Sequence, residues 1–167
     1  MNADDTRVDQ RPWFLCEAML GSLARWLRLF GFDTVYLDHG PPDEVLAERA
    51  RADIRWVLTR DRELASVGPK TMLVRSSVLD DQICEVLSRL GMVPDTSLEG
   101  ARCAECNGEL HEAGREEVAG LAPSYVMATA RRFKRCASCG RVYWPGTHGD
   151  GIQKRMESVV ERLANPS

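Results

Sequence analysis

Short apolar runs alternate with amphipathic stretches along the first hundred residues. Four runs have the length and composition of buried strands, at 13–16, 34–37, 55–59 and 71–74. The amphipathic segments that follow predict helices over 20–30, 42–52, 60–66 and 79–90. The first has apolar residues at helical spacing, and the second has proline in its first turn with acids after it. Strands that alternate with helices predict an α/β domain whose sheet is mostly parallel and flanked by helices.

The pattern changes after a polar segment at 94–101. Glycines, short β-prone runs and two cysteine pairs then replace the alternation of strands and helices, and a final amphipathic helix is predicted over 151–164. We therefore divide the chain into a flexible tail, the α/β domain, a small cysteine-rich domain, and a helix with a terminal tail, at 1–12, 13–100, 101–148 and 149–167.

Composition excludes several classes of protein. The 167 residues contain no apolar stretch long enough to span a membrane, and the polar N-terminus is unlike a secretion signal. We therefore expect a cytoplasmic protein, in which six cysteines do not form a disulfide framework. The net charge is −3, with an excess of acids before residue 100 and of bases after it. The charge alone does not predict a nucleic-acid partner.

The cysteine pairs are the strongest motif. Cys103 and Cys106 form one Cys-x-x-Cys pair, and Cys136 and Cys139 form the second. Two such pairs supply four thiolates to one tetrahedral zinc ion, and four thiolates leave no open position for catalysis. A redox motif and a pair of disulfides are the alternatives, but neither pair opens a helix after a strand as a redox motif does. The spacing predicts a structural zinc ribbon.

Acidic residues follow the predicted strands repeatedly. Glu17 comes directly after the first, Asp43 lies in the helix after the second, Asp61 follows the third, and Asp81 lies beyond the fourth. The carboxyl ends of parallel strands meet at one edge of a sheet, where ligands bind. Clustered carboxylates suit Mg²⁺ or Mn²⁺. Each acid in a first helical turn has an alternative role in capping that helix.

Basic residues supply candidate contacts to phosphate. Arg25 and Arg28 lie three residues apart on the first helix, and Arg60 precedes Asp61. A basic run at 131–135 lies beside the second cysteine pair, and His148 follows in a predicted loop. Basic residues interleaved with aromatics suit the binding of single-stranded RNA. The alternatives are that the arginines only form a solvated helix face and that the aromatics only fill the small core of the ribbon.

Several segments resemble one known family. FLCEAMLGSLARWLRLFGFD (14–33), LTRDRELA (58–65), RCAECNGEL (102–110) and CASCGRVYWPGTH (136–148) are similar to the Mut-seven C-terminal RNase domain family, a branch of the PIN-like nucleases with an embedded zinc ribbon. The resemblance covers about residues 13–160. It implies a PIN-like fold and metal-dependent ribonuclease activity. The first-strand acid of the family is usually aspartate, and this chain has Glu17 there.

The resemblance also assigns the acids. It places the first-strand acid at Glu17, the central acid at Asp61, and the others at Asp43 or Glu44 and at Asp80 or Asp81. We therefore predict a ribonuclease in which Mg²⁺ or Mn²⁺ is held by the first three carboxylates with help from Asp81. RNA would be held by Arg25, Arg28, Arg60 and His148.

Two other functions stay open on the sequence. The first is a non-catalytic RNA-binding or ribonucleoprotein adaptor that keeps the fold and the ribbon, which the glutamate at position 17 favours. The second is a metal-dependent phosphatase or DNA nuclease that uses the same acids. The RNA substrate, the choice between endo- and exonucleolytic cleavage, and the oligomeric state are not predicted.

Overall fold

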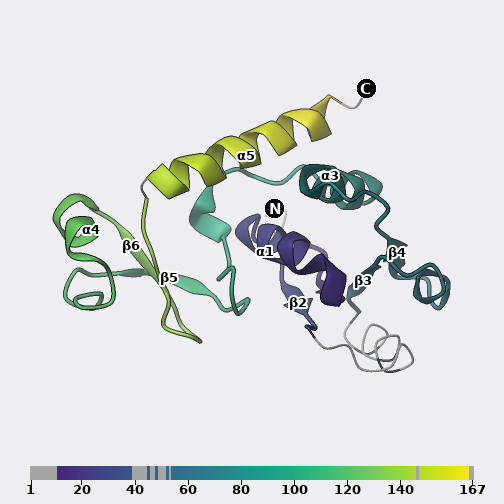
Figure 1. Cartoon of the computed structure of the whole chain (residues 1–167), viewed down its shortest axis with the longest axis horizontal. Helices are drawn as coiled ribbons and strands as arrows, with labels where there is room; N and C mark the ends of the chain where they lie inside the picture. Colours follow the sequence, from purple (N-terminus) through teal and green to yellow (C-terminus); the bar gives the residue numbers. More distant parts are fainter. Residues whose placement is uncertain are drawn as a thin grey trace, which may run out of the picture.

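Two separate sheets and a long C-terminal helix organise the chain (Figure 1). The computed structural model describes residues 11–38, 45, 48, 52, 54–145 and 147–165. The described elements of four or more residues are α1 (Gly21–Leu29), β3 (Trp56–Thr59), α3 (Leu79–Arg89), β5 (Leu110–Ala113), α4 (Ser124–Thr129), β6 (Phe133–Cys136) and α5 (Thr147–Ala164). The shorter elements are β1 (Phe14–Cys16), β2 (Thr34–Tyr36), β4 (Thr71–Leu73) and β7 (Val142–Tyr143), with 3-10 turns at η1 (Ala18–Leu20), η2 (Leu64–Ser66) and η3 (Leu98–Gly100).

The first sheet is parallel throughout and has the order β2-β1-β3-β4. In its register Phe14 pairs with Thr34 on one side and with Trp56 on the other. This confirms the predicted α/β fold with a mostly parallel sheet flanked by helices.

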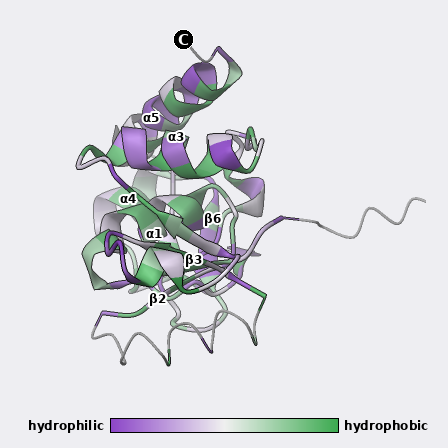
Figure 2. Ribbon diagram, turned by 90° about the vertical axis from the view of Figure 1, so that its right-hand side faces the viewer, coloured by the Kyte–Doolittle hydropathy of each residue, from purple (hydrophilic) through white to green (hydrophobic). Residues whose placement is uncertain are grey.

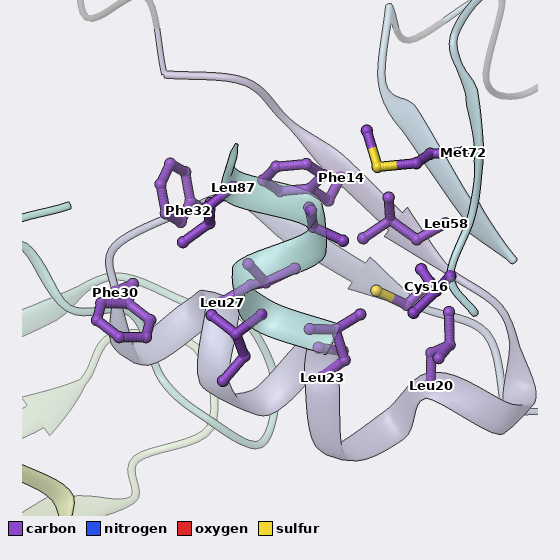
Figure 3. Close-up of a cluster of buried hydrophobic side chains, with 14 of the residues drawn as sticks. Phe14, Cys16, Leu20, Leu23, Leu27, Phe30, Phe32, Leu58, Met72 and Leu87 are labelled. Atoms are coloured by element: carbon purple, nitrogen blue, oxygen red, sulfur yellow. The ribbon is translucent and has the colours of Figure 1, made fainter. Parts of the chain in front are cut away.

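The core lies mainly on one face of this sheet. Side chains alternate across a strand, so Phe14 and Cys16 point to this face and Leu15 points to the other. Leu23 and Leu27 of α1 pack on the first face, as the close-up in Figure 3 shows. Both faces of the central strands are buried, which explains why their sequences are uninterrupted apolar runs.

The second sheet is an antiparallel ribbon with the order β5-β6-β7. We call residues 103–145 the ribbon. Its own small core is formed by Val118, Val126, Ala130 and Phe133. Helix α4 supplies part of this core and was not predicted, because six residues are too few for the helical spacing to stand out from the surrounding loop.

Helix α5 leaves the ribbon and runs across the α/β domain (Figure 1). Met156 and Val159 are fully buried in the main core, against α1 and α3. The guanidinium of Arg155 lies 5.2 Å from the centre of the Trp26 ring. Figure 2 shows hydrophobic and hydrophilic residues alternating along α3 and α5, as expected of helices with one buried face.

Two of the predicted helices differ from the observed elements. The helix predicted over 60–66 is only the 3-10 turn η2, and the final helix begins at Thr147, four residues earlier than predicted. The helix predicted over 42–52 falls largely outside the described residues. The division into domains stays a prediction. No helix in the described part of the chain is long and apolar enough to cross a membrane.

Candidate functional site

The strand order of the parallel sheet reverses between β1 and β3. The chain moves from β1 to β2 on one side, and then places β3 and β4 on the other side of β1. Ligands of parallel α/β sheets bind beyond the carboxyl ends of the strands at such a switch point. Glu17 directly follows β1, and Arg60 and Asp61 directly follow β3. The structure therefore brings three predicted site residues to this edge.

The Glu17 carboxylate is held by the neighbouring strand. Its Oε1 accepts a hydrogen bond of 2.6 Å from the backbone N–H of Arg60. The Glu17 backbone is extended, with φ −75° and ψ 171°, because η1 begins immediately after it. Among the described residues, Oε2 has no hydrogen-bond partner. One oxygen thus fixes the side chain, and within the described residues the other is left open to a ligand.

The Asp61 carboxylate has a comparable arrangement. Its Oδ1 accepts hydrogen bonds from the backbone N–H groups of Glu63 at 2.6 Å and Leu64 at 3.1 Å. These bonds cap the turn before η2, which is the capping role that the sequence left open. Within the described part of the chain, Oδ2 has no hydrogen-bond partner. The residue is exposed, so capping leaves one oxygen facing solvent.

Asp81 is engaged by the C-terminal helix. Its Oδ1 lies 2.5 Å from Nη2 of Arg162 on α5, and its Oδ2 lies 3.4 Å from the Ser76 hydroxyl. The Arg162 hydrogen bond lowers the pKa of Asp81 below its usual value of 3.8. Arg60 donates from Nη1 to the Ser76 carbonyl at 2.8 Å. Asp81 thus lies near the same edge, but its carboxylate is already paired with the Arg162 guanidinium.

The described carboxylates do not converge on one point. Among the described residues, the only group of three or more possible metal ligands is the cysteine cluster. Asp43 and Glu44 lie outside the described residues. The oxygens of Glu17 and Asp61 suit a hard divalent cation, and two such residues supply part of a site rather than a complete one.

The four predicted zinc ligands do converge. The Sγ atoms of Cys103, Cys106, Cys136 and Cys139 all lie within 4.8 Å of one another. Tetrahedral bonds of about 2.3 Å would separate the sulfurs by roughly 3.8 Å. The separations of 3.6 Å between Cys103 and Cys139 and of 3.4 Å between Cys106 and Cys136 match this value closely. A zinc ion therefore fits these residues.

The turns around the cysteines are built for close approach. A Cβ atom at Gly108 would lie 2.7 Å from Sγ of Cys136, so no larger residue fits there without movement. Gly140 has φ +74°, a conformation that favours glycine. Burial acts to raise the pKa of Cys136, but the backbone N–H groups of Cys139 and Ser138 outweigh it and lower the pKa to about 6. Burial raises the pKa of the neighbouring Cys106 to about 12, so within this pair the thiolate that binds metal is favoured at Cys136.

A polar network joins the first cysteine turn to the α/β domain. Asn107 has φ 68°, and its side chain accepts from the Thr34 N–H at 2.9 Å and donates to Asp33 at 2.8 Å. Asp33 also forms ion pairs with Arg55 at 2.6 Å and Arg102 at 3.1 Å. Burial acts to raise the pKa of Asp33, but the hydrogen bonds from Arg55 and Asn107 outweigh it and lower the pKa.

Arg28 is part of this junction rather than of the surface. It is 6% exposed, and it donates to three backbone carbonyls: Thr34 at 2.9 Å, Ala104 at 2.8 Å and Glu105 at 3.1 Å. This placement does not support the predicted contact with RNA. A sequence signal for burial exists, since Arg28 lies one helical turn after the buried Ala24, at the border of the apolar stripe.

Replacing Arg28 with methionine should destabilise the fold. The Arg28→Met variant keeps the aliphatic stem but leaves three carbonyls without their donor, so we expect a loss of about 2–4 kcal/mol. Urea unfolding followed by circular dichroism measures this loss. Arg25→Met on the exposed side of the same helix is the control, expected to change stability by less than about 0.5 kcal/mol. Equal effects of the two substitutions would contradict the junction role.

Two other predicted contacts have different positions. Arg25 is exposed and forms an ion pair with Glu105 of the first cysteine turn. His148 lies in the first turn of α5, not in a loop, and its side chain is outside the described atoms. Three further charged residues at these contacts were not predicted, because their partners lie far away along the chain: Arg162, Glu105 and Arg141.

The chain matches the model of a known protein family. No curated protein and no solved structure matches the chain. The family model described as the Mut7-C RNAse domain matches residues 12–156, which include the parallel sheet, the switch point and all four clustered cysteines. The matched region covers most of the 167 residues and supports a nuclease role with an RNA substrate. The chain belongs to the Mut7-C RNase domain family.

Proposed function

We propose that this protein is a metal-dependent ribonuclease that hydrolyses RNA phosphodiester bonds at the carboxyl edge of the parallel sheet. The observation that carries the proposal is the position of Glu17 and Asp61 on both sides of the switch point, in a chain of an RNase family. Each carboxylate is fixed through one oxygen by backbone N–H groups. Two fixed acids at this position are suited to hold a cation.

The cation would be Mg²⁺ or Mn²⁺, and Asp43 would complete its ligand set with Glu17 and Asp61. When bound, such an ion draws charge from phosphate oxygens and makes water a better nucleophile. The backbone N–H of Arg60 fixes the Glu17 side chain, and the Asp61 side chain orders the turn before η2. Asp81 is already paired with Arg162, so we assign it a supporting role.

The four-cysteine cluster would hold a structural zinc ion. Four thiolates complete a tetrahedron, so the ion orders the ribbon and leaves no position for substrate. Arg25 and the basic run at 131–135 would contact the RNA backbone. The location in the cytoplasm and the PIN-like ancestry stay predictions from the sequence.

A non-catalytic RNA-binding adaptor is the second candidate. It is favoured by glutamate at position 17 and by the pairing of Asp81 with Arg162. An adaptor would bind RNA without a requirement for Mg²⁺ or Mn²⁺ and would leave it intact.

The test is cleavage of labelled single-stranded and hairpin RNAs by zinc-loaded protein. The RNAs are incubated with Mn²⁺, with Mg²⁺ or with no added divalent cation, after elemental analysis has verified the zinc content. We expect cleavage that depends on the added cation. Binding without cleavage under every condition would favour the adaptor. Equal cleavage without the cation would refute the metal dependence.

A further inference from the structure

Three residues from distant parts of the chain meet at one carboxylate on the surface. Glu105 lies in the first cysteine turn, Arg25 on α1, and Arg141 just after the second cysteine turn. Arg25 forms an ion pair with Oε1 of Glu105, and Nη1 of Arg141 lies 4.0 Å from the same oxygen. We call Arg25 and Arg141 the arginine pair. It joins the α/β domain to both halves of the ribbon.

One carboxylate does not neutralise two guanidinium groups. The side chains of Arg25 and Arg141 are 57% and 56% exposed, whereas that of Glu105 is 36% exposed. The contact of Arg141 is at the outer limit of an ion pair and is too long for a hydrogen bond. The donors of Arg141 are therefore weakly satisfied by Glu105. Such a pair has both the positive charge and the exposed N–H donors that bind a phosphate group.

The backbone beneath the pair is fixed. Arg28 donates to the carbonyls of Ala104 and Glu105, which anchors the turn that carries Glu105 to α1. On the other side, the Tyr143 hydroxyl accepts the N–H of Ala104 at 3.2 Å, which ties the strand after Arg141 to the same turn. Rigid placement lowers the entropic cost of binding a ligand with these arginines.

The position of the pair suits a substrate that reaches the carboxyl edge. Arg25 lies one helical turn, roughly 6 Å, beyond Gly21, where α1 begins after Glu17 and η1. At that end of the helix, the Tyr36 hydroxyl donates to the Ala18 carbonyl at 2.8 Å. The pair thus lies between the ribbon and the start of α1. A single strand of RNA bound there would extend from the ribbon towards Glu17.

We infer that Arg25 and Arg141 together bind a phosphate of single-stranded RNA and that Glu105 holds the two side chains in place until RNA replaces it. The inference rests on the proposed function for the identity of the ligand, since the RNA is the substrate. It adds Arg141 and Glu105 to the substrate site and makes the second cysteine turn part of it. A structural zinc ion would then orient a substrate contact as well as stabilise the ribbon.

The alternative role for these arginines is to balance the metal centre. Four thiolates with one zinc ion carry a net charge of −2, and arginines nearby would stabilise that charge. This role predicts that loss of Arg141 lowers zinc affinity and leaves RNA binding unchanged. The two roles are therefore separated by measuring RNA binding and zinc retention on the same variants.

The experiment measures fluorescence anisotropy of a labelled oligouridylate at several salt concentrations. No Mg²⁺ or Mn²⁺ is added, so binding is observed apart from cleavage. We expect Arg25→Gln and Arg141→Gln each to weaken binding about 3- to 10-fold and to reduce the slope of log affinity against log salt by about 0.7. Arg89→Gln is the matched control, because Arg89 is 39% exposed and also pairs with one glutamate.

Glu105→Gln gives a result of opposite sign. Removing the competing carboxylate should strengthen RNA binding about 2- to 3-fold, whereas a purely structural pair would show no gain. The inference is overturned if Arg141→Gln binds RNA like Arg89→Gln, or if its only defect is loss of zinc. A different outcome separates the two proposals. If the arginine variants bind RNA more weakly, as expected, but the parent protein cleaves no RNA with any cation, the proposed function is contradicted and this inference is supported.

Discussion

A Cys103→Ser variant is expected to lose zinc and to unfold at a temperature roughly 6–12 °C lower than the parent, which corresponds to about 3 kcal/mol. Cys103 is fully buried, and its Sγ lies 3.6 Å from that of Cys139. Serine is a poor zinc ligand, so the two cysteine turns lose the bond that joins them. Thermal unfolding and elemental analysis of the purified variant measure both effects.

The loss should extend beyond the ribbon. Asn107 and Arg28 connect the first cysteine turn to the start of β2 and to α1, so disorder in that turn removes support from the parallel sheet. Cys84→Ser on α3 is the control, because this half-buried thiol lies outside the cluster. If the two variants unfolded at the same temperature and had equal zinc content, the cysteine cluster would not be a zinc site.

The second large effect is expected at Glu17. The Glu17→Gln variant keeps an oxygen that accepts the Arg60 N–H but removes the negative charge. If that charge holds the catalytic cation, the loss of about 3–4 kcal/mol in the transition state lowers the cleavage rate roughly 10²- to 10³-fold. Single-turnover cleavage of labelled RNA with Mn²⁺ measures the rate.

The unfolding free energy of the same variant shows whether a lower cleavage rate comes from a loss of folded protein. Glutamine retains the shape and the hydrogen bond of Glu17, so we expect a change in unfolding free energy of less than about 1 kcal/mol. RNA binding should also persist, because the charge removed is negative. A Glu17→Gln protein that cleaves at the parental rate would show that this carboxylate does not hold the catalytic ion.

Much of the fold is predictable because burial leaves a local pattern in the sequence. The strands of the parallel sheet are covered on both faces, so they are continuous apolar runs, and α1 shows a clear apolar stripe. The start of α5 is hidden by Gly149 and Gly151, which weaken the helical signal. The sequence of α4 is too short to show a period.

The candidate site is predictable only in part. The positions of Glu17 and Asp61 follow from the rule that loops after parallel strands meet at one edge. The pairing of Asp81 with Arg162 joins residues 81 positions apart and depends on how α5 packs on α3. Arg25 and Arg28 are three residues apart, yet one is exposed and the other buried, because Arg28 donates to backbone carbonyls inside the junction whereas Arg25 pairs with the Glu105 side chain at the surface.

The most direct test of the account compares Asp61→Asn with Asp95→Asn in single-turnover cleavage of single-stranded RNA with Mn²⁺. Both aspartates accept a backbone N–H two residues on, at 2.6 Å for Asp61 and 2.9 Å for Asp95, and asparagine caps a turn equally well. We expect a rate at least about 10²-fold lower for Asp61→Asn and a parental rate for Asp95→Asn. Equal rates for both variants and the parent would contradict this expectation.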